Sequence, residues 1–180
     1  MTLEDRTYPN GRFSYPDQLT VEERNELISI LEKFPLRLGK TSEIITGDQL
    51  NQSYREGGWN ARQIFHHLAD SHVNMYIRLK LTLTEQEVTI NPYDENKWAA
   101  MEDGSKADHA ISVRIIEPLH QRIVITLRSM SDADFERTYY HPGYKTTVKL
   151  FQMLALYAWH AEHHLGQIHV VTGGHGVKSA

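Results

Sequence analysis

Two histidines near the C-terminus, His160 and His164, have the spacing of a metal-binding pair. They lie in the run LFQMLALYAWHAEHHLGQIHVV, whose length and composition predict one long helix. A separation of four residues is close to one helical turn, so both imidazoles leave the same face of that helix. Two imidazoles on one face can bind a single transition metal. The pair therefore raises the question of a third ligand elsewhere in the chain.

A second histidine-rich segment, ARQIFHHLADSH, contains a candidate for that third ligand. Counting at about 3.6 residues per turn places His67 on the core-facing side of a predicted helix and turns His66 and His72 aside. If this helix packs against the C-terminal helix, His67 converges with His160 and His164. Three neutral nitrogen ligands leave coordination positions open, which is typical of a catalytic metal site rather than a structural one.

Polar residues beside these histidines are candidates for orienting the imidazole rings. Gln167 lies three residues beyond His164, and Asp70 lies three beyond His67, so either side chain could hydrogen-bond a metal ligand. The alternative interpretations are an interhelical contact for Gln167 and an ordinary surface or interface position for Asp70. His163 is one step off the line of the predicted ligands, and we expect it to point aside.

Several larger residues near the predicted site have a simpler structural interpretation. Trp59, Tyr93 and Trp159 are more often packing residues than substrate-binding walls. Asn74 and Arg78 continue the His67 side of its helix and could meet a polar substrate. A salt bridge within the bundle is the simpler expectation there.

Two better-known metal motifs do not fit this chain. The segment HAEHH is not HExxH, because Glu162 follows His160 by two residues and points about 200° away from it. A di-iron bundle needs Glu-x-x-His on two helices and two more glutamates, whereas Glu117 and His120 supply a single half-motif. The GxSxG, P-loop and Rossmann fingerprints are also absent from the sequence.

Composition restricts the class of protein. The chain has 180 residues, a formal net charge of −4, 40% hydrophobic residues and no cysteine. The lack of cysteine excludes disulfides, a cysteine nucleophile and thiolate ligands. There is no basic cluster, no apolar run of about 20 residues and no apolar signal core. We therefore expect a cytoplasmic protein with neither a nucleic-acid nor a membrane partner.

Apolar periodicity and capping signals predict an all-α fold, a four-helix bundle in one domain over residues 1–180. The helices are expected at about residues 21–45, 61–83, 108–129 and 148–171. Residues 1–19 are an N-terminal arm and residues 172–180 a C-terminal tail. Residues 84–106 are too long for a minimal hairpin, so we expect a crossover or a loop that covers a site, with a short helix near 94–101.

Two prolines fall inside the predicted helices. Pro35 is expected to kink the first helix or break it in two, and Pro118 to bend the third. In the third helix, apolar residues at helical spacing predict a buried stripe of Ile111, Ile115, Leu119, Ile123 and Leu127. The metal site needs one particular packing, in which the second and fourth helices are neighbours.

Three segments in this order, GGWNARQIFHHLADSH, NPYDE and YAWHAEHHLGQI, resemble the DinB superfamily, with closest similarity to its YfiT-like metal-dependent hydrolases. The resemblance extends over nearly the whole chain. It implies an up-down-down-up four-helix bundle, a homodimer, and one zinc or nickel ion held by three histidines. These three histidines fall on His67, His160 and His164 of this sequence.

The resemblance implies an enzyme, and three functions stay open from the sequence. A metal-dependent hydrolase would use the ion to lower the pKa of water and attack a small-molecule substrate. A thiol S-transferase of the bacillithiol-using type would use the same ion to activate a low-molecular-weight thiol. A dimeric bundle with a structural metal would catalyse nothing. The sequence does not choose the substrate, the native metal or a general base.

Overall fold

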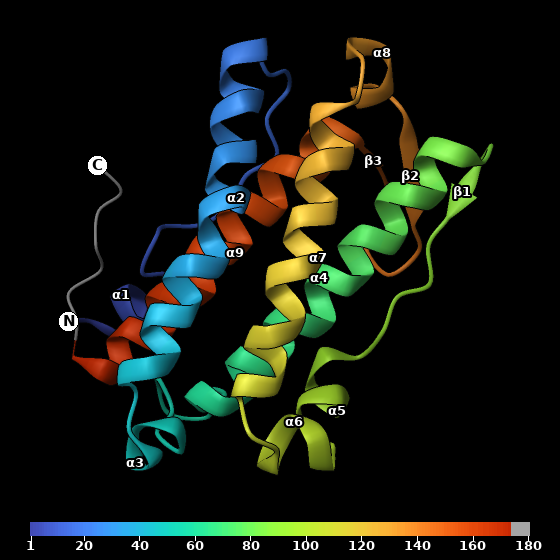
Figure 1. Cartoon of the computed structure of the whole chain (residues 1–180). Helices are drawn as coiled ribbons and strands as arrows, with labels where there is room; N and C mark the ends of the chain where they lie inside the picture. The colour runs from blue at the N-terminus through green and yellow to red at the C-terminus, as the bar shows by residue number, and fades with distance from the viewer. Residues whose placement is uncertain (174–180) are drawn as a thin grey trace.

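Four long helices form a bundle in the computed structural model of the protein, which describes residues 1–173 (Figure 1). They are α2 (Val21–Ile44), α4 (Ala61–Thr84), α7 (Ala110–Arg128) and α9 (Leu150–Thr172). Helices α2 and α4 each pack against both α7 and α9, so consecutive helices α2 and α4 are diagonal. Figure 1 shows α2 and α9 running one way, and α4 and α7 the other. The predicted four-helix bundle is confirmed, with its up-down-down-up order.

Local capping explains where these helices begin and end. Thr20 and Glu23 form a reciprocal capping box before α2, and Asn60 and Gln63 form another before α4. Gly173 follows α9 with a φ of 71°, the left-handed conformation that commonly ends a helix. The predicted tail at 172–180 is therefore partly helix and cap, and residues 174–180 lie outside the described chain.

Helix α2 continues through Pro35 without interruption, so the predicted break does not occur. Proline has no N–H, and the carbonyl of Leu31, four residues earlier, loses its helical hydrogen bond. Nδ1 of His120 lies 2.7 Å from this carbonyl oxygen and donates to it. A side chain from α7 therefore replaces the missing helical donor.

The predicted buried stripe of α7 is confirmed at Ile123 and Leu127 but is wrong in the first half of the helix. Ile111 and Ile115 are 45% and 43% exposed. The residues that α7 buries are Ser112, Ile116, His120, Ile123, Val124 and Leu127. The prediction selected apolar side chains alone and therefore did not include a buried histidine. His120 is 1% exposed, which makes it part of the bundle interior.

A small sheet departs from the all-α expectation, so the fold is mainly helical rather than purely so. It contains β1 (Val88–Thr89), β2 (Thr138–His141) and β3 (Thr146–Lys149), in the order β1-β2-β3. Strand β1 is parallel to β2, and β2 is antiparallel to β3. Strands of two to four residues are too short to produce a readable alternation.

Five short helices complete the described chain. They are α1 (Leu3–Thr7), α3 (Gly47–Leu50), α5 (Glu95–Ala99), α6 (Glu102–Lys106) and α8 (Asp132–Phe135). The predicted short helix near 94–101 corresponds to α5. None of the helices within residues 1–173 is long and apolar enough to cross a membrane.

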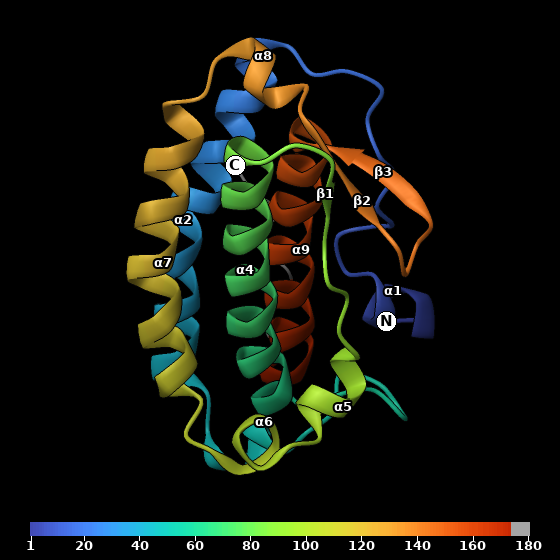
Figure 2. The same cartoon turned by 90° about the vertical axis from the view of Figure 1, so that its right-hand side faces the viewer.

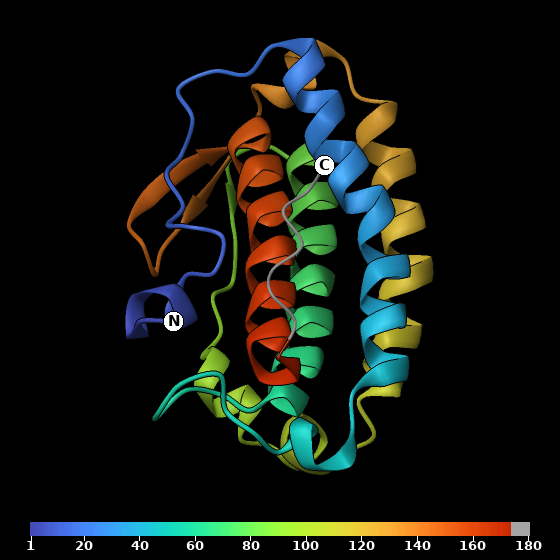
Figure 3. The same ribbon diagram turned by 90° about the vertical axis from the view of Figure 1, so that its left-hand side faces the viewer.

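The elements form three layers. Figure 2 shows α4 and α9 between the α2–α7 pair and an outer layer of α1, the sheet and the connection after α4. Figure 3 shows the chain between α1 and α2 running alongside α9. This close approach depends on Gly166, where an added Cβ would lie 2.4 Å from Oδ1 of Asn10 and 2.8 Å from Cγ of Pro9. The outer layer thereby covers the face of α4 and α9 that the α2–α7 pair leaves open.

Candidate metal centre

Three histidines from two helices converge in the structure. His67 lies on α4, and His160 and His164 lie one turn apart on α9. Each offers one ring nitrogen, and these three nitrogens lie within 4.8 Å of one another. Because α4 packs directly against α9, the packing that the sequence prediction required is present.

The donor set fits a divalent transition metal. Nε2 of His67 lies 3.1 Å from Nε2 of His160. Two nitrogens on a tetrahedral zinc ion, each about 2.0–2.1 Å from the metal, are roughly 3.3 Å apart. Imidazole nitrogen is a ligand that zinc, nickel and copper all accept. The spacing and the chemistry of these side chains therefore match a bound ion, without selecting which one.

Burial keeps the three imidazoles neutral, as metal binding requires. Burial lowers the pKa of His67 to about 4, with a smaller contribution from His163. Burial, and then the neighbouring histidines, hold the pKa values of His160 and His164 well below the usual range. At neutral pH the cluster therefore presents lone pairs rather than positive charges.

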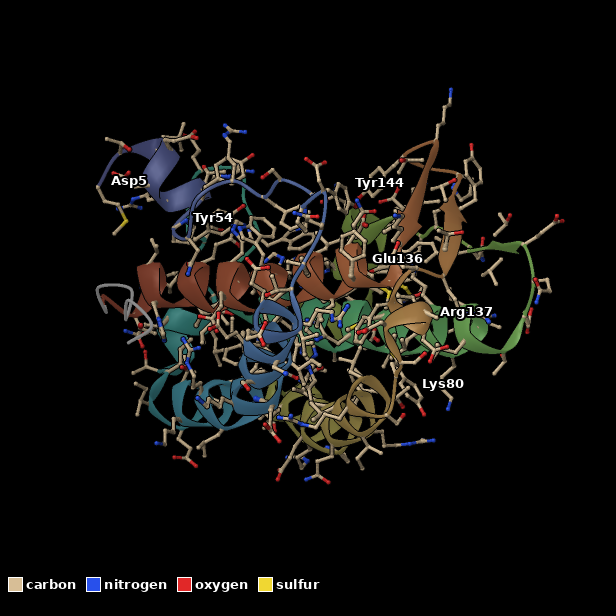
Figure 4. All side chains as sticks on the ribbon, turned by 90° about the horizontal axis from the view of Figure 1, so that it is seen from above. Asp5, Tyr54, Lys80, Glu136, Arg137 and Tyr144 are labelled. Atoms are coloured by element: carbon tan, nitrogen blue, oxygen red, sulfur yellow. The ribbon has the colours of Figure 1, made fainter. Side chains whose placement is uncertain are left out.

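The histidines line a cavity of about 610 Å³. Helices α4 and α9 form one wall, and the other walls come from the N-terminal arm, the segment before α4, the connection after it and the β2–β3 hairpin. Figure 4 shows Tyr54 and Tyr144, two lining residues, on the side of α9 opposite α2. His67 and His164 are buried, as predicted, but they face this cavity rather than α2 and α7. Helix α9 is covered on both sides, and burial alone does not tell the two sides apart.

Three aromatic residues interpreted as packing residues also line this cavity: Trp59, Tyr93 and Trp159. The Trp59 ring centroid lies 4.6 Å from that of His67 and 6.3 Å from that of His164. The indole Nε1 of Trp59 donates to Oδ1 of Asn96 at 3.1 Å, which ties Trp59 to α5. Trp59 therefore forms an apolar cover beside two of the histidines.

Gln167 contacts one ligand candidate and the N-terminal arm. Nδ1 of His164 donates to Oε1 of Gln167 at 2.9 Å, which leaves Nε2 of His164 for the metal. Nε2 of Gln167 donates to the carbonyl of Thr7 at 3.1 Å and lies 3.0 Å from Nε2 of His163. The arm thus fixes Gln167, and Gln167 fixes the tautomer and the orientation of His164.

Asp70 does not have the position that the sequence suggested. Within the described chain its carboxylate forms no hydrogen bond to His67 and does not line the cavity. Burial, with a smaller effect of Asp103, raises the pKa of Asp70 to about 6. A residue three positions later is turned by about 60° around the helix, which is consistent with the position of Asp70 outside the cavity lining.

His66 and Glu162, which the sequence analysis placed away from the metal site, have other partners. Nδ1 of His66 lies 2.8 Å from Oγ of Ser112, at the contact between α4 and α7. Glu162 forms a bidentate ion pair with Arg37 of α2, whose second contact is 2.9 Å. A carboxylate engaged in this way is not a free base at the histidine cluster. His163, expected to point aside, does line the cavity and stacks on Trp159.

A chain of buried histidines runs inward from His160. Nδ1 of His160 lies 3.4 Å from Nε2 of His72, and Nδ1 of His72 lies 2.8 Å from Nε2 of His120. His120 in turn donates to the carbonyl of Leu31. His72 is 0% exposed and stacks on Phe34 in the bundle interior. His72 is thus not a ligand, but it connects a ligand to the core.

This chain has a defined hydrogen-bond direction. The Leu31 carbonyl can only accept, so Nδ1 of His120 carries a proton. Burial lowers the pKa of His120 to about 4, so its Nε2 is an acceptor at neutral pH and Nδ1–H of His72 donates to it. The same reasoning makes Nδ1 of His160 the donor to His72 and leaves Nε2 of His160 for the metal. Sequence reasoning missed His72 and His120, because the link appears only when three helices are packed together.

The sequence profile of the DinB superfamily matches residues 22–168. The chain belongs to the DinB superfamily. YfiT of Bacillus subtilis, named as a probable metal-dependent hydrolase, is 41% identical over 93% of this chain and 94% of its own length. OB0782 of Oceanobacillus iheyensis, named in the same way, is 44% identical over 89% of this chain and 92% of its own length.

Solved structures agree with membership of the DinB superfamily. The structure of Bacillus subtilis YfiT, described as having an unusual four-helix bundle topology, matches with a TM-score of 0.91 at 40% identity, over 94% of this chain and 97% of YfiT. A mycothiol-dependent maleylpyruvate isomerase matches with a TM-score of 0.63 at 15% identity, over 79% of this chain and 59% of the isomerase. The second likeness concerns the fold alone.

Proposed function

We propose that this DinB-superfamily protein is a metal-dependent hydrolase that attacks a small-molecule substrate with water. His67, His160 and His164 would hold one divalent ion, zinc or nickel. The observation that carries the proposal is the position of their nitrogens at the wall of an open cavity of about 610 Å³. The names of its relatives, which share 41% and 44% of aligned residues with this chain, point the same way.

The accessible cavity favours a catalytic ion over a structural one. Within residues 1–173, no further histidine or carboxylate joins the three-histidine cluster. A structural zinc ion has four protein ligands as a rule, whereas catalytic sites keep a position for water or substrate. A bound ion supplies Lewis acidity, which lowers the pKa of water toward about 7 or polarises a substrate carbonyl.

The chain's own residues orient the ligands and shape the site. Gln167 holds His164 by its Nδ1, and His72 holds His160 by its Nδ1, so both present Nε2 to the same point. Trp59 packs on His67 and limits the access of water from that side. A cavity of about 610 Å³ has the size of a small-molecule site.

Metal analysis tests the ligand set. Protein purified without a histidine tag should take up about one zinc or nickel ion per chain. His67→Ala, His160→Ala and His164→Ala should each lower affinity by at least about 100-fold, because each removes a direct ligand. His66→Gln is the matched control, since His66 neighbours His67 but bonds to Ser112. Full affinity in any of the three alanine variants removes that residue from the set.

Turnover and unfolding separate the three functions. Metal-dependent cleavage of an ester or amide panel supports hydrolysis. Metal-dependent conjugation of an electrophile with bacillithiol or another small thiol, without cleavage of the panel, overturns hydrolysis in favour of thiol transfer. Loss of the fold on metal removal, without either activity, assigns the ion a structural role.

A further inference from the structure

Arg78 lies along the same cavity as the histidine cluster. His67, Ser71 and Arg78 all line the cavity from one side of α4, as their spacing of four and seven residues allows. Nη1 of Arg78 donates to the hydroxyl of Tyr157 at 3.2 Å. The Tyr157 ring centroid is 5.8 Å from that of His160. Tyr157 thus connects the guanidinium to the part of α9 that carries His160, while Arg78 itself lies about three helical turns beyond His67 on α4.

Arg78 has no counter-ion in the described part of the chain. The ion pairs within residues 1–173 do not include it. The carboxylate that lines the cavity, Glu95, is not among its partners. Nε of Arg78 is buried and has no hydrogen-bond acceptor among the described residues. The expectation of a salt bridge within the bundle is therefore wrong.

The groups around Arg78 do not neutralise its charge. Burial raises the pKa values of Tyr93, Tyr139 and Tyr157, so their hydroxyls stay protonated at neutral pH. Burial, and then the charge of Arg78 itself, lowers the pKa of His141. The guanidinium is therefore a permanent cation among neutral hydroxyls and a neutral imidazole.

Four other arginines of the described chain have a carboxylate partner, and Arg55 has neutral oxygen partners. Carboxylates pair with Arg12, Arg24, Arg37 and Arg128. Arg55, the second arginine that lines the cavity, donates from Nε to the hydroxyl of Tyr54 and from Nη1 to the carbonyl of Glu56. A partly buried cation without a counter-ion carries a desolvation cost that an incoming anion would offset.

We propose that Arg78 is the anion-binding residue of this cavity, and that the natural ligand is a small molecule bearing a carboxylate or phosphate. Nη1 donates to Tyr157, and Nε is buried without an acceptor among the described residues, so Nη2 is the donor left to meet a ligand. A carboxylate or a phosphate in the cavity can accept a charge-assisted hydrogen bond from it and offset the charge of the guanidinium. The anionic group would be bound in the same cavity as the atom that reaches the metal. As an assignment of substrate class, this inference rests on the proposed function.

The binding test uses metal-free protein, in which an anion cannot coordinate an ion at the histidines. The probes are inorganic phosphate and acetate, titrated at constant ionic strength and followed by calorimetry and by the Nε–H signal of arginine in NMR spectra. The wild type should bind at least one probe and shift the Arg78 signal. Arg78→Gln should weaken binding by about 10-fold or more, since hydrogen bonds to charged groups are worth about 1.5–3 kcal/mol.

Two further variants keep the result interpretable. Arg55→Gln, the matched control, should retain affinity within about twofold, because Arg55 already has oxygen partners. Arg78→Lys keeps the charge and loses the planar fork, so it should bind with intermediate affinity. It also replaces Arg78→Gln as the test if the glutamine variant fails to melt cooperatively.

The outcomes also identify the ligand chemistry. Binding of phosphate alone assigns a phosphate ligand, and binding of acetate alone assigns a carboxylate. No binding of either probe, or equal affinity in the wild type and Arg78→Gln, overturns the proposal. If anions bind through Arg78 but no hydrolysis is found, the proposed function fails and the anion site remains. If hydrolysis is found and Arg78 binds nothing, only the anion site is removed.

Discussion

The backbone carbonyl of Leu31 accepts a hydrogen bond from Nδ1 of His120 at a distance of 2.7 Å. This carbonyl is available because Pro35 cannot supply the helical N–H. The hydrogen bonds continue from His120 through His72 to His160, so the missing N–H of Pro35 in α2 helps to orient a metal-ligand candidate on α9. Residues of the bundle interior therefore help to orient His160, although the cavity lies on the face of α4 and α9 opposite α2 and α7.

Replacing His120 by leucine should weaken metal binding without touching a ligand. The change removes the acceptor of the His72 Nδ1 proton, so the tautomer of His160 is no longer enforced. We expect an affinity loss of about 10–100-fold, the usual effect of removing a partner of a metal ligand. Competition against a chromophoric chelator measures it. An affinity equal to that of the His66→Gln control would rule out the histidine chain as a positioning device.

The variant Pro35→Ala should separate stability from metal affinity. Alanine restores a helical N–H to the Leu31 carbonyl and removes the steric conflict of proline, so the free energy of unfolding should stay equal or rise. The restored donor competes with His120, and metal affinity should fall by a few-fold. Denaturant unfolding and metal titration on the same sample check both. A parallel fall of stability and affinity would contradict this account.

Stability of the metal-free protein should fall on mild acidification. The folded-state pKa of His120 is about 4, below its ordinary value of 6.5, because burial disfavours its charged form. The unfolded state therefore binds more protons between these values, and the contribution of His120 is complete above about pH 6.5 and is lost as the pH falls toward 4. This shift corresponds to about 3 kcal/mol. Denaturant unfolding from pH 7 to pH 4 should show a shallower decline for His120→Leu.

Gly166→Ala should release the N-terminal arm. The new methyl group would overlap Asn10 and Pro9, which are held against α9. We expect a loss of about 1–3 kcal/mol in the free energy of unfolding and faster proteolysis within residues 1–19. Gly39→Ala is the control, because nothing lies within 4 Å of a Cβ there and the helix should gain up to about 1 kcal/mol. Equal cleavage of both variants would show that Gly166 does not seat the arm.

Local sequence patterns were sufficient to predict the four helices and the three metal-ligand candidates. The capping residues Thr20 and Asn60 and the stop at Gly173 gave helix ends close to those observed. The two histidines one turn apart, and the phase of His67, indicated which imidazoles could meet. These properties depend on residues within one or two helical turns, and helical periodicity encodes them directly.

Tertiary packing decided what surrounds those histidines. Three features each involve residues far apart in the chain. They are the side of α9 that faces a cavity, the link from His160 through His72 to His120, and the lack of a counter-ion for Arg78 within residues 1–173. The strands are likewise too short to be recognised before they pair. A sequence sets the phase of each helix locally, whereas its neighbours and cover result from long-range packing that no single periodicity contains.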